Sequence, residues 1–64
     1  MTDYARAVER LLRRAGCRRV RSGKGSHVIW YSPVSRRSFS VPATIRSRHT
    51  ANAILRQAGL PKAF

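Results

Sequence analysis

The spacing of the apolar residues changes twice along this 64-residue chain, and those two changes restrict the folds open to it. Near both ends, apolar side chains recur every three or four residues, as they do on one face of a helix. Between these stretches, apolar and polar residues alternate, which is typical of strands with one buried face. A chain this short buries only about 60% of its unfolded surface, so all of these segments must share one small core.

The first apolar stripe predicts a helix over about residues 3–15. Its members are Tyr4, Val8, Leu11, Leu12 and Ala15. We expect Thr2 or Asp3 to cap its start. Both carboxylates, Asp3 and Glu9, lie in its N-terminal half, where the helix dipole favours negative charge. Gly16 follows as the residue that ends it.

Three short alternating segments come next, and we expect strands over about residues 17–22, 27–32 and 37–41. A glycine-rich turn separates the first two strands, and Pro33 is well placed to start the second turn. Pro42 is expected to end the third strand. Strands joined by turns this tight pair as an antiparallel meander.

The second of these strands carries apolar residues on both faces. Alternation places His27, Ile29 and Tyr31 on one face, with Val28 and Trp30 on the other. Because both sets are apolar, the sequence does not decide which set faces the helices, and we favour Val28 and Trp30 as the pair that faces the core. That orientation leaves His27 and Tyr31 on an open sheet face. Trp30 and Tyr31 are both candidates for stacking on bases, although an aromatic residue in a central strand is more often part of the core.

The last apolar stripe predicts a helix over about residues 49–58, capped by Ser47 or Thr50 and ended by Gly59. Its apolar members are Ala51, Ile54, Leu55 and Ala58. The element order is therefore α-β-β-β-α, which predicts a single α+β domain over residues 1–64. We expect two layers, with both helices on one face of a three-stranded antiparallel sheet. The other sheet face is left open to solvent or to a partner.

Cationic side chains outnumber carboxylates by 14 to 2, so the formal net charge is +12. All of the cations except Lys24 and Lys62 are arginine. A field of this size favours a polyanionic partner, either nucleic acid or an acidic protein. Asp3 and Glu9 are too few for a two-metal nuclease or a paired-carboxylate glycosidase. The single cysteine, Cys17, excludes an internal disulfide and a Cys-rich zinc site, and we expect it to be buried as a small hydrophobe.

These counts predict a protein without a metal or a small-molecule cofactor. No apolar run approaches the ~18 residues of a membrane span, and the first residues lack the apolar region of a signal peptide. We therefore expect a cytoplasmic protein with no membrane partner. The basic, amphipathic first helix raises the alternative of a membrane-active peptide, which the strand and turn pattern disfavours.

The candidate for chemistry is the run GKGSH at residues 23–27. Its His27 belongs to the side-chain type that exchanges protons near neutral pH, and the glycines before it let a substrate approach the backbone closely. RNA carries its own nucleophile, the 2′-hydroxyl, so one histidine with several cations suffices to cleave it. The residues that we expect to bind substrate are Arg19, Arg21, Lys24, Gly25, Ser26 and Arg37.

Each of these features also has a plainer interpretation. A lone histidine at the start of a strand is more often structural, and the Gly-Lys-Gly run is not a Walker A loop. His49 is interpreted as a polar residue near the start of the last helix. The residues by themselves therefore leave two functions open: a ribonuclease, and an RNA-binding module that does not cut.

Several segments, in this order, resemble the HicA family of toxins from bacterial type II toxin–antitoxin systems. They are LLRRAGC at residues 11–17, RSGKGSH at 21–27, FSVP at 39–42 and AILRQAGL at 53–60. The Gly-Ser-His element and the C-terminal ILRQAGL run are specific when they occur together at this spacing. The chain departs from the family pattern at Cys17, in the turn after Pro33 and in the loop at residues 43–49.

The resemblance implies a fold like that of double-stranded-RNA-binding domains, with the same α-β-β-β-α order. It also implies a metal-independent endoribonuclease that acts on mRNA, with His27 essential for toxicity. The implied partners are mRNA and a HicB-type acidic antitoxin, whose partial RNase-H-like domain covers the toxin's site.

Overall fold

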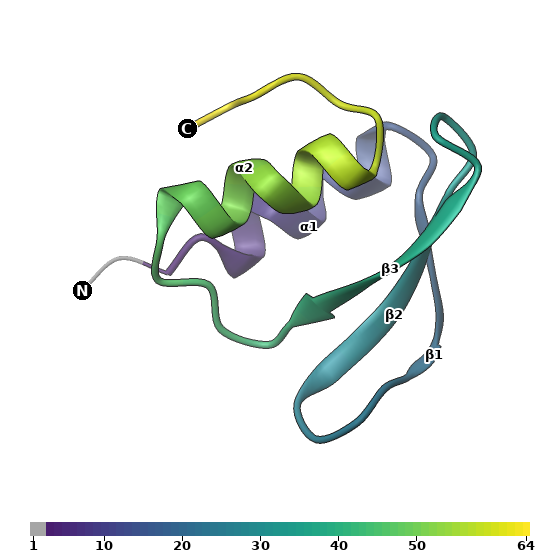
Figure 1. Ribbon diagram of the computed structural model, residues 1–64, viewed down its shortest axis with the longest axis horizontal. Coiled ribbons are helices and arrows are strands. Elements are labelled where there is room, and N and C mark those ends of the chain that lie inside the picture. The colour runs from purple at the N-terminus through teal and green to yellow at the C-terminus, as the bar shows by residue number, and fades with distance from the viewer. Residues whose placement is uncertain (1–2) are drawn as a thin grey trace.

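The computed structural model describes residues 3–64, and in this range the chain forms two helices and three strands (Figure 1). In chain order they are α1 (Ala5–Arg14), β1 (Arg18–Ser22), β2 (His27–Ser32), β3 (Arg37–Pro42) and α2 (Arg48–Gln57). The strands pair antiparallel in the order β1-β2-β3. The predicted α-β-β-β-α order is confirmed, and it is compatible with the double-stranded-RNA-binding-domain fold that the resemblance implies.

Both helices pack on one face of the sheet and lie beside each other (Figure 1). One buried cluster joins the two layers, with members from α1 (Val8, Leu12), β2 (Trp30), β3 (Phe39, Val41) and α2 (Ala51, Ile54, Leu55). Trp30 is only 1% exposed, whereas His27 is exposed. The predicted inward face of the second strand and the predicted two-layer α+β architecture are therefore both confirmed. Cys17 is buried, as expected.

The start of α1 is tied to the loop that precedes α2. One carboxylate oxygen of Asp3 accepts the N–H of Ala5 at 2.9 Å and the N–H of Ile45 at 3.0 Å. The N–H of Tyr4 donates to the Ile45 carbonyl at 2.7 Å. Asp3 therefore precedes the helix and binds the N–H of its first residue, so α1 begins at Ala5 rather than at residue 3. The alternative cap, Thr2, lies outside the described residues.

The ends of the helices decide where the next segments begin. The N–H of Cys17 donates to the Leu12 carbonyl at 2.9 Å, which draws Cys17 back to α1, so β1 begins at Arg18. The helix α2 ends with the same pattern of bonds. There Gly59 has a φ of +81°, and a Cβ added to it would lie 2.9 Å from Cγ1 of Val34. Only glycine fits this position without strain.

The end of β3 differs from the sequence prediction, and the start of α2 shows which of the two predicted caps is used. The strand β3 includes Pro42, which pairs with His27, instead of ending before it. Because β3 is an edge strand, the missing N–H of proline costs no ladder hydrogen bond. Ser47, rather than Thr50, caps α2, since its hydroxyl accepts the N–H of His49 at 3.2 Å.

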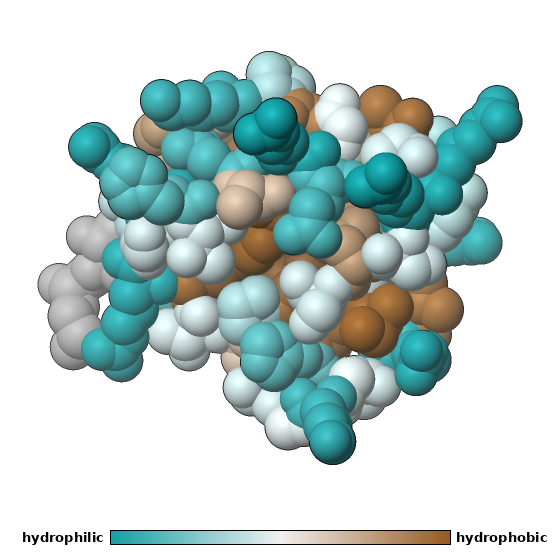
Figure 2. Space-filling view, viewed as in Figure 1, coloured by the Kyte–Doolittle hydropathy of each residue, from teal (hydrophilic) through white to brown (hydrophobic). Residues whose placement is uncertain are grey.

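The surface carries its charge on both layers. Arg6 and Arg10 of α1, Arg21 of β1 and Arg56 of α2 are all exposed. Figure 2 shows hydrophilic side chains projecting around the rim of one face, with apolar residues in the crevice between them. Within residues 3–64, no helix is long and apolar enough to cross a membrane.

One buried polar side chain joins the sheet to the end of α2. The hydroxyl of Ser32, which is 0% exposed, donates to the Ala58 carbonyl at 2.6 Å. The same oxygen accepts the N–H of Val34 at 3.2 Å and the N–H of Ser35 at 3.3 Å. Ser32 therefore fixes the β2–β3 turn against α2.

Replacement of this hydroxyl leaves buried polar groups without a partner. We expect Ser32→Ala to lower the free energy of unfolding by about 1–3 kcal/mol, measured by urea denaturation. Ser38→Ala, on an exposed position of β3, is the matched control and should change it by no more than about 0.5 kcal/mol. Equal losses in the two variants would contradict this role of Ser32.

The stability of the fold should depend on the protonation of Asp3. The backbone N–H of Ile45, and then that of Ala5, hold the pKa of this carboxyl below its usual 3.8. A carboxyl whose pKa is lower in the folded state gives stability above its unfolded pKa, and this stability is lost as pH falls through the folded pKa. Asp3→Asn keeps an acceptor oxygen but does not titrate. Its melting temperature should therefore fall less than that of the wild type between about pH 5 and about pH 2, and a parallel fall would refute the role of Asp3.

Candidate functional site

A tight, glycine-containing turn presents His27 at the first position of β2. The N–H of Gly23 donates to the His27 carbonyl at 2.8 Å, and the N–H of His27 donates to the Lys24 carbonyl at 3.2 Å. On the other side, the N–H of Ala43 donates to the Ser26 carbonyl at 3.0 Å and anchors the turn to the end of β3. The backbone around His27 is thus held on both sides.

The turn is open to solvent at Gly25. Gly25 has a φ of +61°, and nothing lies within 4 Å of a Cβ added at this position. The turn therefore needs glycine for its backbone conformation rather than to avoid a neighbour. His27 itself is exposed, so both the turn and the imidazole are accessible from solvent.

The imidazole of His27 contacts a hydroxyl from the neighbouring strand. Its Nδ1 lies 3.1 Å from the Oγ of Ser40. Ser40 pairs with Ile29 in the β2–β3 register, so it is a diagonal neighbour of His27 on the open face of the sheet. A serine hydroxyl both donates and accepts. The Ser40 hydroxyl can therefore hydrogen-bond to Nδ1 in either neutral tautomer of the ring, which leaves Nε2 for another partner.

The structure brings four of the predicted substrate-binding residues close to His27 along the chain or across the sheet. Lys24, Gly25 and Ser26 form the turn that leads into it. Arg21 of β1 pairs with Ile29 and lies on the same open face. Of these four residues, Lys24 and Arg21 give this end of the sheet its positive charge.

Two predicted residues lie elsewhere. Arg19 pairs with Trp30, so it lies on the side of the helices, where it lines a hollow together with Glu9. Arg37 pairs with Ser32 at the far end of β2, about 16 Å from His27 at the usual strand rise. Arg19 is separated from Arg21 by an irregularity in β1, because the register shifts between them. Without this shift both arginines would face the same way.

Two contacts on the open face were not predicted from the sequence. Ser40 is the partner of His27, and the guanidinium of Arg18 lies 5.8 Å from the centroid of the Tyr31 ring. Alternation with Phe39 does place Ser40 on the open face. The register of the hairpin, which the sequence did not give, was needed to show that Ser40 is the serine that reaches His27.

The chemistry available at this face is proton transfer together with electrostatic binding of anions. Within residues 3–64, no group of three or more His, Cys, Asp or Glu side chains lies close enough to hold a metal ion. Neither carboxylate lies on the open face: Asp3 binds backbone N–H groups near α1, and Glu9 belongs to α1. The site thus has an imidazole, hydroxyls and cations, with no carboxylate to orient the imidazole or to repel phosphate.

A family model described as the HicA toxin of bacterial toxin-antitoxin matches residues 5–60. This range runs from the start of α1 to the segment that follows α2, and it includes the turn and His27. Among curated proteins and among solved structures, no match was found.

The contact between Ser40 and His27 can be tested by NMR without any substrate. We expect Ser40→Ala to change the ¹⁵N chemical shifts of the His27 ring, because these shifts report the tautomer and its hydrogen bond. Ser40→Thr keeps the hydroxyl and suits a strand, so it should retain the wild-type shifts. Ser38→Ala, on the same face and strand, is the control. Unchanged His27 shifts in Ser40→Ala would show that the contact does not hold the ring.

Proposed function

The chain belongs to the HicA toxin family of bacterial toxin–antitoxin systems, and on this basis we propose that it is an endoribonuclease that cleaves mRNA without a metal cofactor. Cleavage of mRNA would arrest translation and growth. The observation that carries the proposal is the exposed imidazole of His27, with its Nδ1 in contact with Ser40 and its neighbours cationic rather than acidic.

RNA suits this set of groups because it brings its own nucleophile. His27 takes the proton of a 2′-hydroxyl through Nε2, and the 2′-oxygen attacks the adjacent phosphorus. The bond from phosphorus to the 5′-oxygen then breaks, and that oxygen takes a proton from water. The products are a 2′,3′-cyclic phosphate and a 5′-hydroxyl. DNA has no 2′-hydroxyl and is not cleaved by this route.

The cations near His27 stabilise the charge that develops on the phosphate. Lys24 and Arg21 are the nearest by position in the turn and the sheet, and Gly25 and Ser26 allow the strand to approach. Arg19 and Arg37 lie farther away. In this proposal they bind the RNA backbone away from the bond that is cut.

Membership of the family implies a cognate antitoxin, and we propose an acidic protein of the HicB type. The formal charge of +12 on 64 residues favours such a partner. An antitoxin that covers the open face of the sheet would block access to His27. It would also offset the repulsion among the toxin's own arginines.

A non-catalytic RNA-binding module is the second candidate. Two observations favour it: the half-buried Tyr31 ring on the open face has the guanidinium of Arg18 beside it, and the net charge is high. Stacking and phosphate contacts suffice for binding. The two candidates differ only in whether RNA is cut.

Cleavage should depend on His27. We expect purified wild-type protein to fragment labelled RNA in the presence of EDTA, and His27→Ala to do so about 10²–10⁴-fold more slowly. His27→Ala should bind the same RNA with little loss of affinity, because the cations remain. An RNA with a single 2′-deoxynucleotide at the cleaved position should resist cleavage at that bond.

Ser38→Ala serves as the matched control, since it changes the same sheet face away from His27. Its cleavage rate and its arrest of growth on expression should equal those of the wild type. Equal cleavage by His27→Ala would refute the role of His27. A shift in RNA mobility without fragments, in every variant, would favour the binding module.

A further inference from the structure

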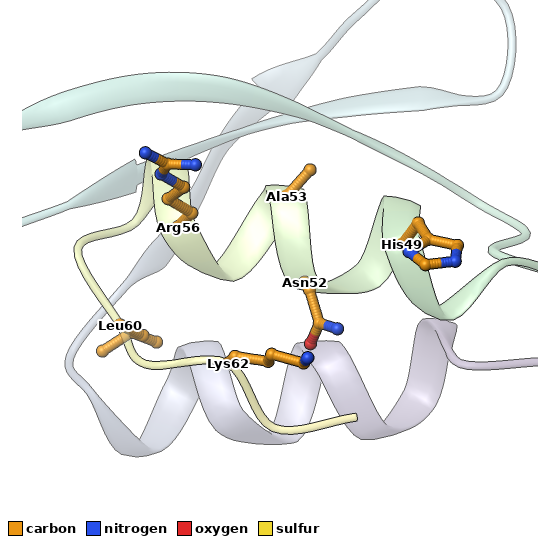
Figure 3. Close-up of a pocket in the computed structure, with 6 residues that line it drawn as sticks. All are labelled: His49, Asn52, Ala53, Arg56, Leu60 and Lys62. Atoms are coloured by element: carbon orange, nitrogen blue, oxygen red, sulfur yellow. The ribbon is translucent and has the colours of Figure 1, made fainter.

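A second cationic site lies on the opposite layer of the molecule from His27. A hollow with a volume of about 380 Å³ lies between the exposed side of α2 and the segment that follows it (Figure 3). It is lined by His49, Asn52, Ala53, Arg56, Leu60 and Lys62. The four residues from α2 recur at helical spacing, so they form one stripe along the helix. The remaining two belong to the segment after α2.

The wall opposite the helix is fixed by one amide side chain. The Nδ2 of Asn52 donates to the Phe64 carbonyl at 3.0 Å, and its Oδ1 accepts the N–H of Ala63 at 3.2 Å and of Phe64 at 3.1 Å. At the other end, the N–H of Leu60 donates to a carbonyl of α2. The backbone at Lys62 therefore lies between two points that are bonded to the helix, and Figure 3 shows its side chain directed toward Asn52.

The lining contains two permanent cations and one histidine but no carboxylate. Arg56 and Lys62 supply the cations, and both are exposed. The two acidic side chains lie away from the hollow. Asp3 is bonded at the start of α1, and Glu9 lies beside the arginines of that helix. The side chains that line the hollow therefore carry a net positive charge.

We propose that this hollow binds phosphate groups of an RNA strand, at a distance from the cleaved bond. The guanidinium of Arg56 offers a planar set of donors to phosphate oxygens, and the ammonium of Lys62 adds a point charge. The choice of RNA over free phosphate rests on the function proposed above. A protein occupant is disfavoured because the lining has no aromatic anchor and its apolar members are only Ala53 and Leu60.

The position of the hollow determines what it can affect. α2 packs on the helix side of the sheet, whereas His27 lies on the open side. Phosphates held in the hollow are therefore not those that react at His27. The site should contribute to RNA affinity and to KM, and kcat should stay unchanged.

A comparison of charge-matched variants tests whether the hollow is a specific site. RNA binding is measured by fluorescence anisotropy at several salt concentrations, with His27→Ala as the background so that no RNA is cut. We expect R56Q/K62Q to lower the slope of log K against log [salt] by about 1.4, or about 0.7 for each lost phosphate contact on a single strand. At 0.15 M salt this corresponds to a roughly tenfold weaker affinity. R6Q/R10Q removes the same charge from α1 and should change the slope by less.

A variant that keeps every charge tests whether RNA binding depends on the structure of the hollow or only on the net positive charge of the protein. Asn52→Ala releases the segment that carries Lys62 but keeps every cation. We expect it to weaken RNA binding in the same direction as R56Q/K62Q while circular dichroism shows that the helices remain folded. Wild-type affinity in folded Asn52→Ala, or equal effects of the two charge-matched pairs, would overturn the proposal.

Two further measurements identify the occupant. Addition of inorganic phosphate should shift the amide NMR signals of Arg56 and Lys62, and if it does so while R56Q/K62Q binds RNA normally, the site takes free phosphate and the RNA assignment is wrong. Weaker binding of the antitoxin with unchanged RNA binding would instead make the hollow a protein contact and overturn the proposal. Failure of His27-dependent cleavage would refute the ribonuclease but not the binding result.

Discussion

Trp30 lies at the centre of the layer in which the sheet meets the two helices, with 1% of its surface exposed. The guanidinium of Arg13 lies 5.3 Å from the centroid of its ring and closes the edge of this layer. A chain of 64 residues has apolar area for one such layer only. The second face of the sheet is therefore uncovered, and His27 is exposed because the core is on the other side.

The scarcity of carboxylates shapes both the chemistry and the surface. With only two acids, neither on the open face, the groups around His27 are limited to hydroxyls, backbone amides and cations. The proposed reaction uses the nucleophile of the substrate for this reason. For the same reason, the side chains that line the hollow beside α2 include cations but no acidic residue. In the proposed function, proton transfer is confined to one face while RNA affinity is spread over both layers.

The positions of the helices and strands were predictable because they follow from local spacing. Stripes at helical period, alternation in the middle of the chain and glycines at the helix ends are readable without any tertiary contact. The errors fall at the boundaries, where distant groups intervene. Asp3 accepts a hydrogen bond from Ile45 and lies outside α1, which begins later than expected. Pro42 is part of β3 because that strand lies at the edge of the sheet. Alternation placed Val28 and Trp30 on one face of the second strand, but both faces are apolar, so the sequence only favoured this face as the buried one.

The sequence by itself determined the element order, the net charge, the lack of acidic clusters and the placement of His27 after a glycine-rich turn. Tertiary structure decided which side chains meet. The β2–β3 register selected Ser40 as the partner of His27, and the irregularity in β1 separated Arg19 from Arg21. Asn52 folded the final segment over α2 and brought Lys62 to that helix. Each of these depends on hydrogen bonds between residues far apart in the chain, and such bonds leave no periodic pattern in the sequence.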